Sequence, residues 1–429
     1  MDFTKAPLNH GKPINFSHGT VLGRPVFGQY NPFYFQKENE YRLRNVLAKM
    51  DHHLPVPGEG LKRAMNFYAD YGGCGLWRMS WPEFMINGYG KGIVNGLTQM
   101  VIDPNFYKGI SAVRLQRQAT PEQLKFIEFL KAVQQEHGFK IIYEVDDVVF
   151  AEDIPHFNKS REAFDKPEIK DSIHKILGLV DEMCVVSPYM RDYYKRKTGK
   201  QEISVIPNYA PKFWLNDHYN PSKIERSYVK NRKRPIIGYL GSGTHFDVTN
   251  STNQQDDFAH VIDMVIRTRN KYQWVFMGGF PLRLMPYIDR KEIIHVPWVN
   301  IYEYPRVFAT LGINAVVAPL SNNEFNRSKS DIKIFEAGAL GIPGTFQNLE
   351  PYSKAKYKFT TAEEMISNLD RILKDRNEYM KLSAAVRKEA EGRWLEDHLD
   401  EHTDLLFKPF NEKRAAIDNN GYNNGYKIS

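Results

Sequence analysis

The sequence predicts an α/β protein made of two doubly wound domains that face each other across a cleft. The chain has 429 residues, of which 42% are hydrophobic, enough to bury more than one core. From Ala64 onward, short β-branched or aromatic runs alternate with longer amphipathic segments, as in βαβ units with a mainly parallel sheet. A polar stretch, residues 208–234, interrupts this alternation and indicates a linker between two such units. Both units are therefore expected to be Rossmann-like.

Ten short hydrophobic runs are predicted to be strands. In the first half of the chain they are residues 65–70, 97–102, 112–115, 140–145, 182–186 and 203–206. In the second half they are residues 235–240, 273–277, 293–296 and 313–318. Two such sets of parallel strands bring helix N-termini and strand-end loops together between the domains, and this geometry suits a nucleotide diphosphate.

Two capping signals predict where helices begin. Thr120 is followed by a proline and then by Gln123, which predicts an N-cap, a proline at the first helical position and a capping box. Gly138 is expected to end this helix. Thr360 and Glu363 predict a second capping box, ahead of the helix that closes the second domain.

The positions of these elements predict six parts of the chain. Apolar residues at helical spacing near the end predict a terminal helix, and the repetitive NNGYNNGYKIS after it predicts a flexible tail. The parts are an N-terminal extension of unassigned role (1–60), the first domain (61–215), the linker (216–234), the second domain (235–392), the terminal helix (393–410) and the tail (411–429).

Composition restricts the class of protein. The two cysteines, Cys74 and Cys184, lie in different apolar segments without CxxC spacing, which argues against a disulfide framework or a structural zinc site and indicates a reducing compartment. No leader pattern and no apolar run of roughly 18 residues is present, so we expect a cytoplasmic protein without a membrane span. The net charge of +7 favours an anionic partner such as nucleic acid, an acidic membrane surface or a phosphorylated small molecule.

The strongest functional signal is the segment NRSKSDIKIFEAGALGIP, residues 326–343. Lys329 and Lys333 are four residues apart and share one face if the segment is helical, with Arg327 close to the helix start. Three cations and the free N–H groups of a helix N-terminus suit a diphosphate. Glu336 would lie on the same face and accept hydrogen bonds from two ribose hydroxyls. The alternative is an ordinary charged surface helix.

A second signal is the turn that follows the first predicted strand of the second domain, within IIGYLGSGTHFDV. Successive backbone N–H groups and a hydroxyl in such a turn form a nest for a phosphate. The predicted phosphate-binding residues are Gly241, Ser242, Gly243 and Thr244. His245 completes the turn, and a histidine without a chemical task is the alternative at that position.

Two segments of the first domain complete the predicted site. Gly73 and its neighbouring glycines follow the first strand and permit a tight loop against a ligand, but their spacing does not match the GxGxxG of a nicotinamide-dependent dehydrogenase. A later strand, KIIYEV, ends in Asp146 and Asp147, which are placed to orient an acceptor hydroxyl or bind a metal. N-capping of the next element is the alternative for these aspartates.

Two of these segments resemble one enzyme family. SKSDIKIFEAGALGIP is similar to the donor-binding segment K-x-x-x-K-x-x-E-x-x-A-x-G-x-P of retaining GT-B glycosyltransferases of the GT4-like group, and the turn around Gly241 resembles that family's G-x-x-G-[ST]-x-T-H. The sequence departs from the family's two-glutamate pattern, because Ser328 stands where the first glutamate falls.

The resemblance implies a retaining hexosyl- or pentosyltransferase that uses a UDP-sugar as substrate and requires neither a cofactor nor a divalent metal. The catalytic residues would be Lys329, Arg327, His245, Asp146 and Asp147. The donor-binding residues would be Gly73, Gly241, Ser242, Gly243, Thr244, Lys333 and Glu336. A non-catalytic nucleotide-sugar-binding module, a phosphorylase and a sugar-nucleotide epimerase remain alternatives.

The predicted acceptor surface lies in the first domain, where basic residues alternate with tyrosines and can track a phosphate backbone. Its residues are Arg78, Arg191, Lys195, Arg196 and Lys197. The whole chain is also similar to T-even-type bacteriophage glycosyltransferases, which implies duplex DNA with hydroxymethylcytosine as the acceptor, a flipped-out base and the host cytoplasm. The alternative is an enzyme of bacterial surface-glycan synthesis, whose basic patch contacts anionic lipid headgroups.

Overall fold

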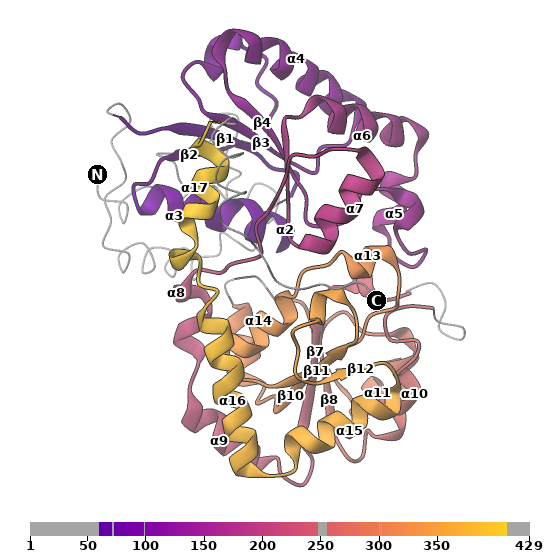
Figure 1. The fold of residues 1–429 in the computed structure, drawn as a ribbon. Coiled ribbons are helices and arrows are strands. Elements are labelled where there is room, and N and C mark those ends of the chain that lie inside the picture. Colours follow the sequence, from indigo (N-terminus) through magenta and orange to yellow (C-terminus); the bar gives the residue numbers. More distant parts are fainter. Residues whose placement is uncertain are drawn as a thin grey trace, which may run out of the picture.

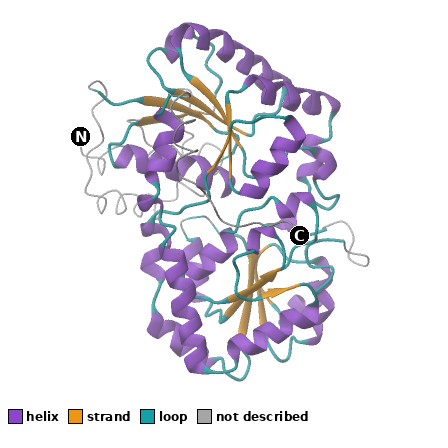
Figure 2. Ribbon diagram, in the orientation of Figure 1, coloured by secondary structure: helices purple, strands orange, loops and turns teal. Residues whose placement is uncertain are grey.

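The computed structural model describes residues 60–70, 73–97, 99–247, 255–299, 301 and 303–409, and Figure 1 shows them as two domains. The predicted N-terminal extension, apart from residue 60, and the predicted tail lie outside the described residues. Each domain contains one sheet with helices packed around it (Figure 2). The prediction of two α/β domains is therefore confirmed.

The sheet of the first domain has six parallel strands in the order β2-β1-β3-β4-β5-β6. Its strands are β1 (Arg63–Phe67), β2 (Ile93–Leu97), β3 (Ala112–Gln116), β4 (Lys140–Glu144), β5 (Glu182–Val185) and β6 (Ile203–Val205). The chain places β2 on one side of β1 and β3 on the other, so the winding of this sheet reverses between β1 and β3.

The sheet of the second domain is also six-stranded and parallel, in the order β12-β11-β10-β7-β8-β9. Its strands are β7 (Ile236–Gly241), β8 (Gln273–Gly278), β9 (Ile294–Val296), β10 (Ala315–Ala318), β11 (Gly344–Gln347) and β12 (Lys358–Phe359). The winding reverses between β7 and β10, and ligands of doubly wound sheets bind at such a reversal.

Helices connect the strands in both domains. Those of the first half are α2 (Gly73–Gly75), a π-helical turn (Leu76–Ser80), α3 (Trp81–Gly88), α4 (Pro121–His137), α5 (Ser160–Phe164), α6 (Pro167–Leu179) and α7 (Pro188–Thr198). Those of the second half are α8 (Lys212–Leu215), α9 (Pro221–Lys230), α10 (Ile262–Arg267), α11 (Met285–Asp289), α12 (Tyr304–Thr310), α13 (Glu324–Arg327), α14 (Ile332–Ala339), α15 (Ala362–Leu373), α16 (Arg376–Glu391) and α17 (Leu399–Phe407).

The capping predictions are confirmed for α4 and shifted by one residue for α15. Thr120 and Gln123 form the capping box of α4, and Gly138 ends it in a left-handed conformation with φ of 74°. The box of α15 is made by Thr361 and Glu364 rather than by the residues one position earlier, because the helix begins at Ala362 and its third residue must supply the carboxylate.

One strand prediction was wrong, and two strands were not predicted. Residues 97–102 were expected to form the second strand, but β2 ends at Leu97, because Ile93 to Leu97 pair with β1 and Ile102 is exposed to solvent. The short strands β11 and β12 were not predicted. Each has at most four residues, too few to show a hydrophobic period, and lies in the sheet because a neighbouring strand pairs with it.

The polar stretch after β6 is not an extended linker. Asn220 caps α9 by accepting a hydrogen bond from the backbone N–H of Lys223 at 2.9 Å, so these polar residues form a helix. The helix packs on the second domain, where the Tyr228 hydroxyl donates to the carbonyl of Leu373 at 2.8 Å and the Tyr228 ring stacks on Tyr379.

The end of the chain returns to the first domain. The predicted terminal helix is divided at His398, which precedes α17, and α17 packs against α3, β1 and β3 of the first domain (Figure 1). Lys140 donates to the carbonyl of Leu405 at 2.6 Å, and Lys62 donates to the carbonyl of Phe407 at 2.8 Å. The last described helix is therefore part of the core of the first domain.

A carboxylic acid is buried beside this core. Glu83 of α3 is 1% exposed and accepts hydrogen bonds from Asn66 Nδ2 at 3.1 Å and from the Tyr68 hydroxyl at 2.9 Å. Burial raises the pKa of Glu83 to about 8, although both hydrogen bonds oppose the shift. The protonated form is therefore favoured at neutral pH.

We expect Glu83→Gln to flatten the dependence of stability on pH. The pKa of Glu83 is higher in the folded than in the unfolded chain, so its contribution is fully present below the unfolded pKa and is lost as pH rises through about 8. Between pH 5 and pH 9 the free energy of unfolding of the wild type should fall by roughly 2–4 kcal/mol more than that of the variant. Urea unfolding across this range measures the difference, and parallel curves would contradict it.

Candidate active site

The two domains meet where the strands of both sheets end. The Tyr189 hydroxyl of α7 donates to Glu324 of α13 at 2.9 Å. Asn208, just beyond β6, donates to the hydroxyl of Ser330 at 3.1 Å. Lys329 lies 3.7 Å from Asp147, which follows β4. The segment between α13 and α14 therefore faces the carboxyl ends of the strands of the first domain.

The lysine segment does not form one continuous helix. Helix α13 ends at Arg327 and α14 begins at Ile332, so Lys329 lies in the connecting turn while Lys333 lies in the first turn of α14. The prediction that these lysines share one helical face was wrong. Asp331 interrupts the helix because its backbone leaves the helical region and its carboxylate pairs with Arg393 at 2.7 Å.

The side chain of Lys333 reaches from α14 to the carboxyl end of β7. Its ammonium group donates to the carbonyl of Leu240 and lies 4.6 Å from the centre of the Tyr239 ring. A Cβ at Gly241 would lie 2.8 Å from Lys333 Nζ, so glycine is needed for this approach. Burial lowers the pKa of Lys333, and Glu336 opposes the shift. An anion beside the turn would restore the charged form.

Glu336 lies one turn further along α14. It accepts a hydrogen bond from the Tyr304 hydroxyl of α12 at 2.8 Å. Burial raises the pKa of Glu336, while Tyr304 and Lys333 lower it. The carboxylate is thus held by α12 with one oxygen, and its other oxygen is a second acceptor of the kind expected for a ribose hydroxyl.

Arg327 stands apart from the two lysines. Its guanidinium binds Glu350 through Nε at 3.0 Å and Nη2 at 2.9 Å, and it lies 5.7 Å from the centre of the Tyr189 ring. The predicted cluster of three cations is thus spread over two helices and a turn. Lys333 contacts the glycine-rich turn, Lys329 is near enough to His245 of that turn to lower its pKa, and Arg327 is paired with a carboxylate.

The glycine-rich turn contains a histidine–aspartate pair. After β7, residues Gly243 to His245 form a 3-10 turn in which the Ser242 and Thr244 hydroxyls lie 2.6 Å apart. His245 Nδ1 lies 2.6 Å from Asp257 Oδ2. Burial and the nearby Lys329 lower the pKa of His245 to about 4, although Asp257 opposes the shift. Asp257 was missed because no sequence pattern relates it to the turn.

The first domain contributes two aspartates and an arginine. Asp146 and Asp147 follow β4, and Arg117, which follows β3, lies 3.8 Å from the first and 4.0 Å from the second. Arg117 also pairs with Asp70 and has a left-handed backbone with φ of 43°, rare for a residue other than glycine. Sequence reasoning found both aspartates but not the arginine between them.

The same aspartates are close enough to Cys74 to share a metal ion. The ligand atoms of Cys74, Asp146 and Asp147 lie within 4.8 Å of one another. The positive charge that faces this group is the guanidinium of Arg117. The three side chains therefore already have a cation beside them.

Arg78 does not face an acceptor, and the predicted contact with nucleic acid was wrong. Its side chain is buried on the π-helical turn, with Nε 2.6 Å from Glu144 and Nη1 2.6 Å from the carbonyl of Ile206. Arg114 binds the other oxygen of Glu144 at 2.9 Å. The two guanidinium groups and the carboxylate therefore pair with one another inside the first domain, between β3, β4 and the end of β6.

The glycine loop after β1 is tight at Gly75, one of the glycines that were predicted to permit a tight loop there. A Cβ at Gly75 would lie 1.9 Å from the carbonyl oxygen of Asp70, so no other residue fits without a shift of the backbone. Gly73 has open space at the corresponding position. The role of Gly73 in donor binding stays a prediction.

The predicted basic surface follows α7, and much of its charge is paired. Arg191 binds Asp192 at 2.8 Å, Arg196 binds Glu324 at 3.3 Å, and Lys197 binds Asp153 at 2.6 Å. Lys195 lies on the same helix and is partly buried. Because Arg196 pairs with α13, the surface borders the lysine segment of the second domain.

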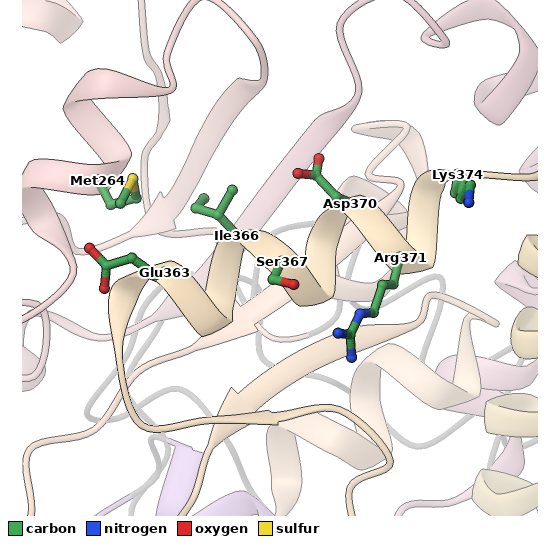
Figure 3. A pocket seen from close by; sticks show the side chains of 7 residues that line it. All are labelled: Met264, Glu363, Ile366, Ser367, Asp370, Arg371 and Lys374. Atoms are coloured by element: carbon green, nitrogen blue, oxygen red, sulfur yellow. The ribbon is translucent and has the colours of Figure 1, made fainter.

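A depression of about 510 Å³ lies elsewhere, along the outer side of α15 (Figure 3). It is lined by Met264, Glu363, Ile366, Ser367, Asp370, Arg371 and Lys374. None of the predicted site residues contributes to it. Across the described parts of the chain, no helix combines the length and the apolar character needed to cross a membrane.

Comparison with known proteins identifies the fold. The structure of HepE from Anabaena in complex with UDP aligns with a TM-score of 0.53 and 10% identity, over 81% of this chain and 100% of HepE. This chain has the GT-B fold. No protein-family model and no curated protein matches the sequence.

Two further structures align with the GT-B chain at lower TM-scores. TarM gives 0.48 at 10% identity over 72% of this chain, which spans 56% of the length of TarM. An α-glucosyltransferase in complex with UDP and a 13-mer DNA containing a HMU base gives 0.46 at 12% identity, over 83% of this chain and 99% of that one. Both scores are below 0.5, so the assignment of the fold depends on HepE.

We expect Arg78→Ala to destabilise the protein rather than weaken a surface contact. Arg114 still balances the charge of Glu144, but Glu144 Oε1 and the carbonyl of Ile206 lose their guanidinium donor, and each buried acceptor left in this way costs roughly 1–3 kcal/mol. Urea unfolding measures the change, with Arg191→Ala on α7 as the matched exposed control, for which little change is expected. If Arg78→Ala is as stable as the wild type but binds the acceptor more weakly, Arg78 contacts the acceptor as the sequence predicted.

Proposed function

We propose that this chain is a glycosyltransferase that moves a hexose or pentose from a UDP-sugar to an acceptor hydroxyl. One observation carries the proposal. Lys333, with its pKa lowered by burial, lies against the glycine-rich turn at the carboxyl end of β7, where the second sheet reverses its winding. An ammonium group beside a glycine-rich turn suits a diphosphate, whose negative charge favours the protonated form of the lysine. The similar fold of HepE, whose structure holds UDP, supports the choice of donor.

In this proposal the site acts mainly by electrostatic stabilisation. The sugar–phosphate bond breaks as positive charge develops on the sugar and negative charge on the departing diphosphate. Lys329 and Lys333 neutralise the diphosphate, and Arg327 contributes if it leaves Glu350. Neither a metal nor another cofactor takes part, because the chain supplies the cations.

We propose that the transfer retains the anomeric configuration, with the acceptor attacking from the face that the diphosphate leaves. No side-chain nucleophile is then needed, and the departing phosphate takes the acceptor proton. Asp146 and Asp147 lie across the domain boundary from Lys329, where they orient the acceptor hydroxyl. His245 lies on the donor side of the same boundary.

The acceptor in this proposal is the hydroxymethyl group of a modified cytosine in duplex DNA. The net charge of +7 and the basic residues of α7 next to α13 support a polyanionic partner. The partial pairing of those residues reduces the attraction, and a bacterial surface glycan is the acceptor to be tested against DNA.

We expect Lys333→Ala and Lys329→Ala each to reduce turnover of the UDP-sugar at least about 100-fold, because each removes a charge that stabilises the leaving diphosphate. UDP release measures turnover, and thermal unfolding checks that the variants fold. Lys381→Ala, which removes an exposed lysine paired with Glu378 on α16, is the matched control. Unchanged turnover in both site variants would rule out the proposed donor site.

Mass spectrometry of nucleosides identifies the acceptor. DNA with hydroxymethylcytosine and unmodified DNA are incubated with the protein and a panel of UDP-sugars, and we expect a pentose or hexose mass on the hydroxymethylated base alone. UDP release without a labelled base would keep the glycosyltransferase and exclude DNA as its acceptor. No UDP release with any donor or with glycan acceptors would contradict the proposed function.

A further inference from the structure

Asp257 connects three segments that border the proposed donor site. It lies just before α10 with 1% of its side chain exposed. Its Oδ2 meets His245 Nδ1 at 2.6 Å. Its Oδ1 accepts hydrogen bonds from the Ser321 backbone N–H at 2.9 Å, the Ser321 hydroxyl at 2.8 Å and Asn326 Nδ2 at 2.6 Å. The carboxylate therefore joins the turn after β7 to the loop after β10 and to α13.

This set of contacts determines the tautomer of His245. Burial alone would raise the pKa of Asp257, but the hydrogen bond from His245 and that from the Ser321 backbone N–H lower it, so the carboxylate stays ionised. An ionised carboxylate only accepts hydrogen bonds, so Nδ1 of His245 must carry the proton that the pair shares. In the neutral ring Nε2 is then a hydrogen-bond acceptor.

The surroundings keep that ring neutral. His245 is largely buried, and Lys329 and Lys333 both oppose a positive charge on it, while the Tyr239 ring lies 6.4 Å away. A neutral nitrogen lone pair does not attract a phosphate oxygen, which is itself only an acceptor. It does accept a hydrogen bond from a hydroxyl. A nucleotide sugar carries hydroxyls on its ribose, for which Glu336 is the expected acceptor, and on the sugar at the other end of the diphosphate, which leaves the transferred sugar for His245.

We propose that Asp257 is a positioning residue that holds His245 with Nε2 as an acceptor for a hydroxyl of the transferred sugar. The pair thereby distinguishes donors by their sugar, while the lysines bind the diphosphate that all of them share. This inference rests on the proposed function and adds to it a residue that selects the donor sugar.

The test compares the affinity of the protein for a complete UDP-sugar with its affinity for UDP alone. Calorimetric titration of Asp257→Asn with UDP and with the UDP-sugar found to be turned over separates the two contacts. We expect UDP affinity to change less than about twofold and UDP-sugar affinity to fall about tenfold, the loss of one buried hydrogen bond. His245→Ala, at a position partly open to solvent, should reproduce this pattern, and the double variant should be no weaker than either single one.

Asp256→Asn is the matched control. Asp256 is a buried neighbour that accepts hydrogen bonds from the backbone N–H groups of Asp247 and Phe258, outside the contact with His245. Its variant should leave the ratio of UDP-sugar to UDP affinity unchanged. UDP-sugars that lack one hydroxyl provide a second readout, because the wild type should discriminate against one of them and His245→Ala should not.

The outcomes separate this inference from the proposed function. Equal losses of UDP and UDP-sugar affinity in Asp257→Asn and His245→Ala would reduce the pair to a structural role and overturn the inference. A wild-type protein that binds UDP-sugars no better than UDP would overturn it as well. A wild-type protein that binds neither would instead overturn the proposed function.

Discussion

The buried pairing of Glu144 with two arginines is the interaction on which the first half of the site depends. Arg114 on β3 and Arg78 on the π-helical turn bind opposite oxygens of Glu144, the last residue of β4. Each arginine donates to a different oxygen of the carboxylate, so removing one leaves a neutral buried pair in which a Glu144 oxygen has lost its guanidinium donor. The loops that begin just beyond this network carry Arg117 and Asp146, so the network sets their starting positions.

The second half of the site depends on how the domains are joined. The chain passes between the domains twice, and the two passages pair where the Leu395 N–H donates to the carbonyl of Ala210 at 2.9 Å. Arg393 near that passage binds Asp331, the residue just before α14. The turn that holds Lys329 is thus fixed from both sides, next to carboxylates of the other domain. The side chains that the proposed function assigns to the donor and to the acceptor are thereby brought together where the domains join.

Much of this arrangement could be predicted from the sequence. The capping box at Thr120, the left-handed end at Gly138 and nine of the ten predicted strands depend on residues within a few positions of each other. The approach of the lysine segment to the turn at Gly241 was also predictable, because the carboxyl ends of parallel strands in one doubly wound sheet lie at the same edge. These features are local, or follow from a topological rule.

The rest was decided by contacts between residues distant in the chain. Nothing near Arg78 in the sequence indicates that Glu144 neutralises it, and nothing near Asp257 indicates that it binds His245. The sequence by itself determined the two α/β domains and the capped helices, because period and capping are read from neighbouring residues, and it supplied the residue types of the proposed donor site. Only the tertiary structure decided which charges are buried in pairs and which face the domain boundary, because pairing depends on distances across the fold.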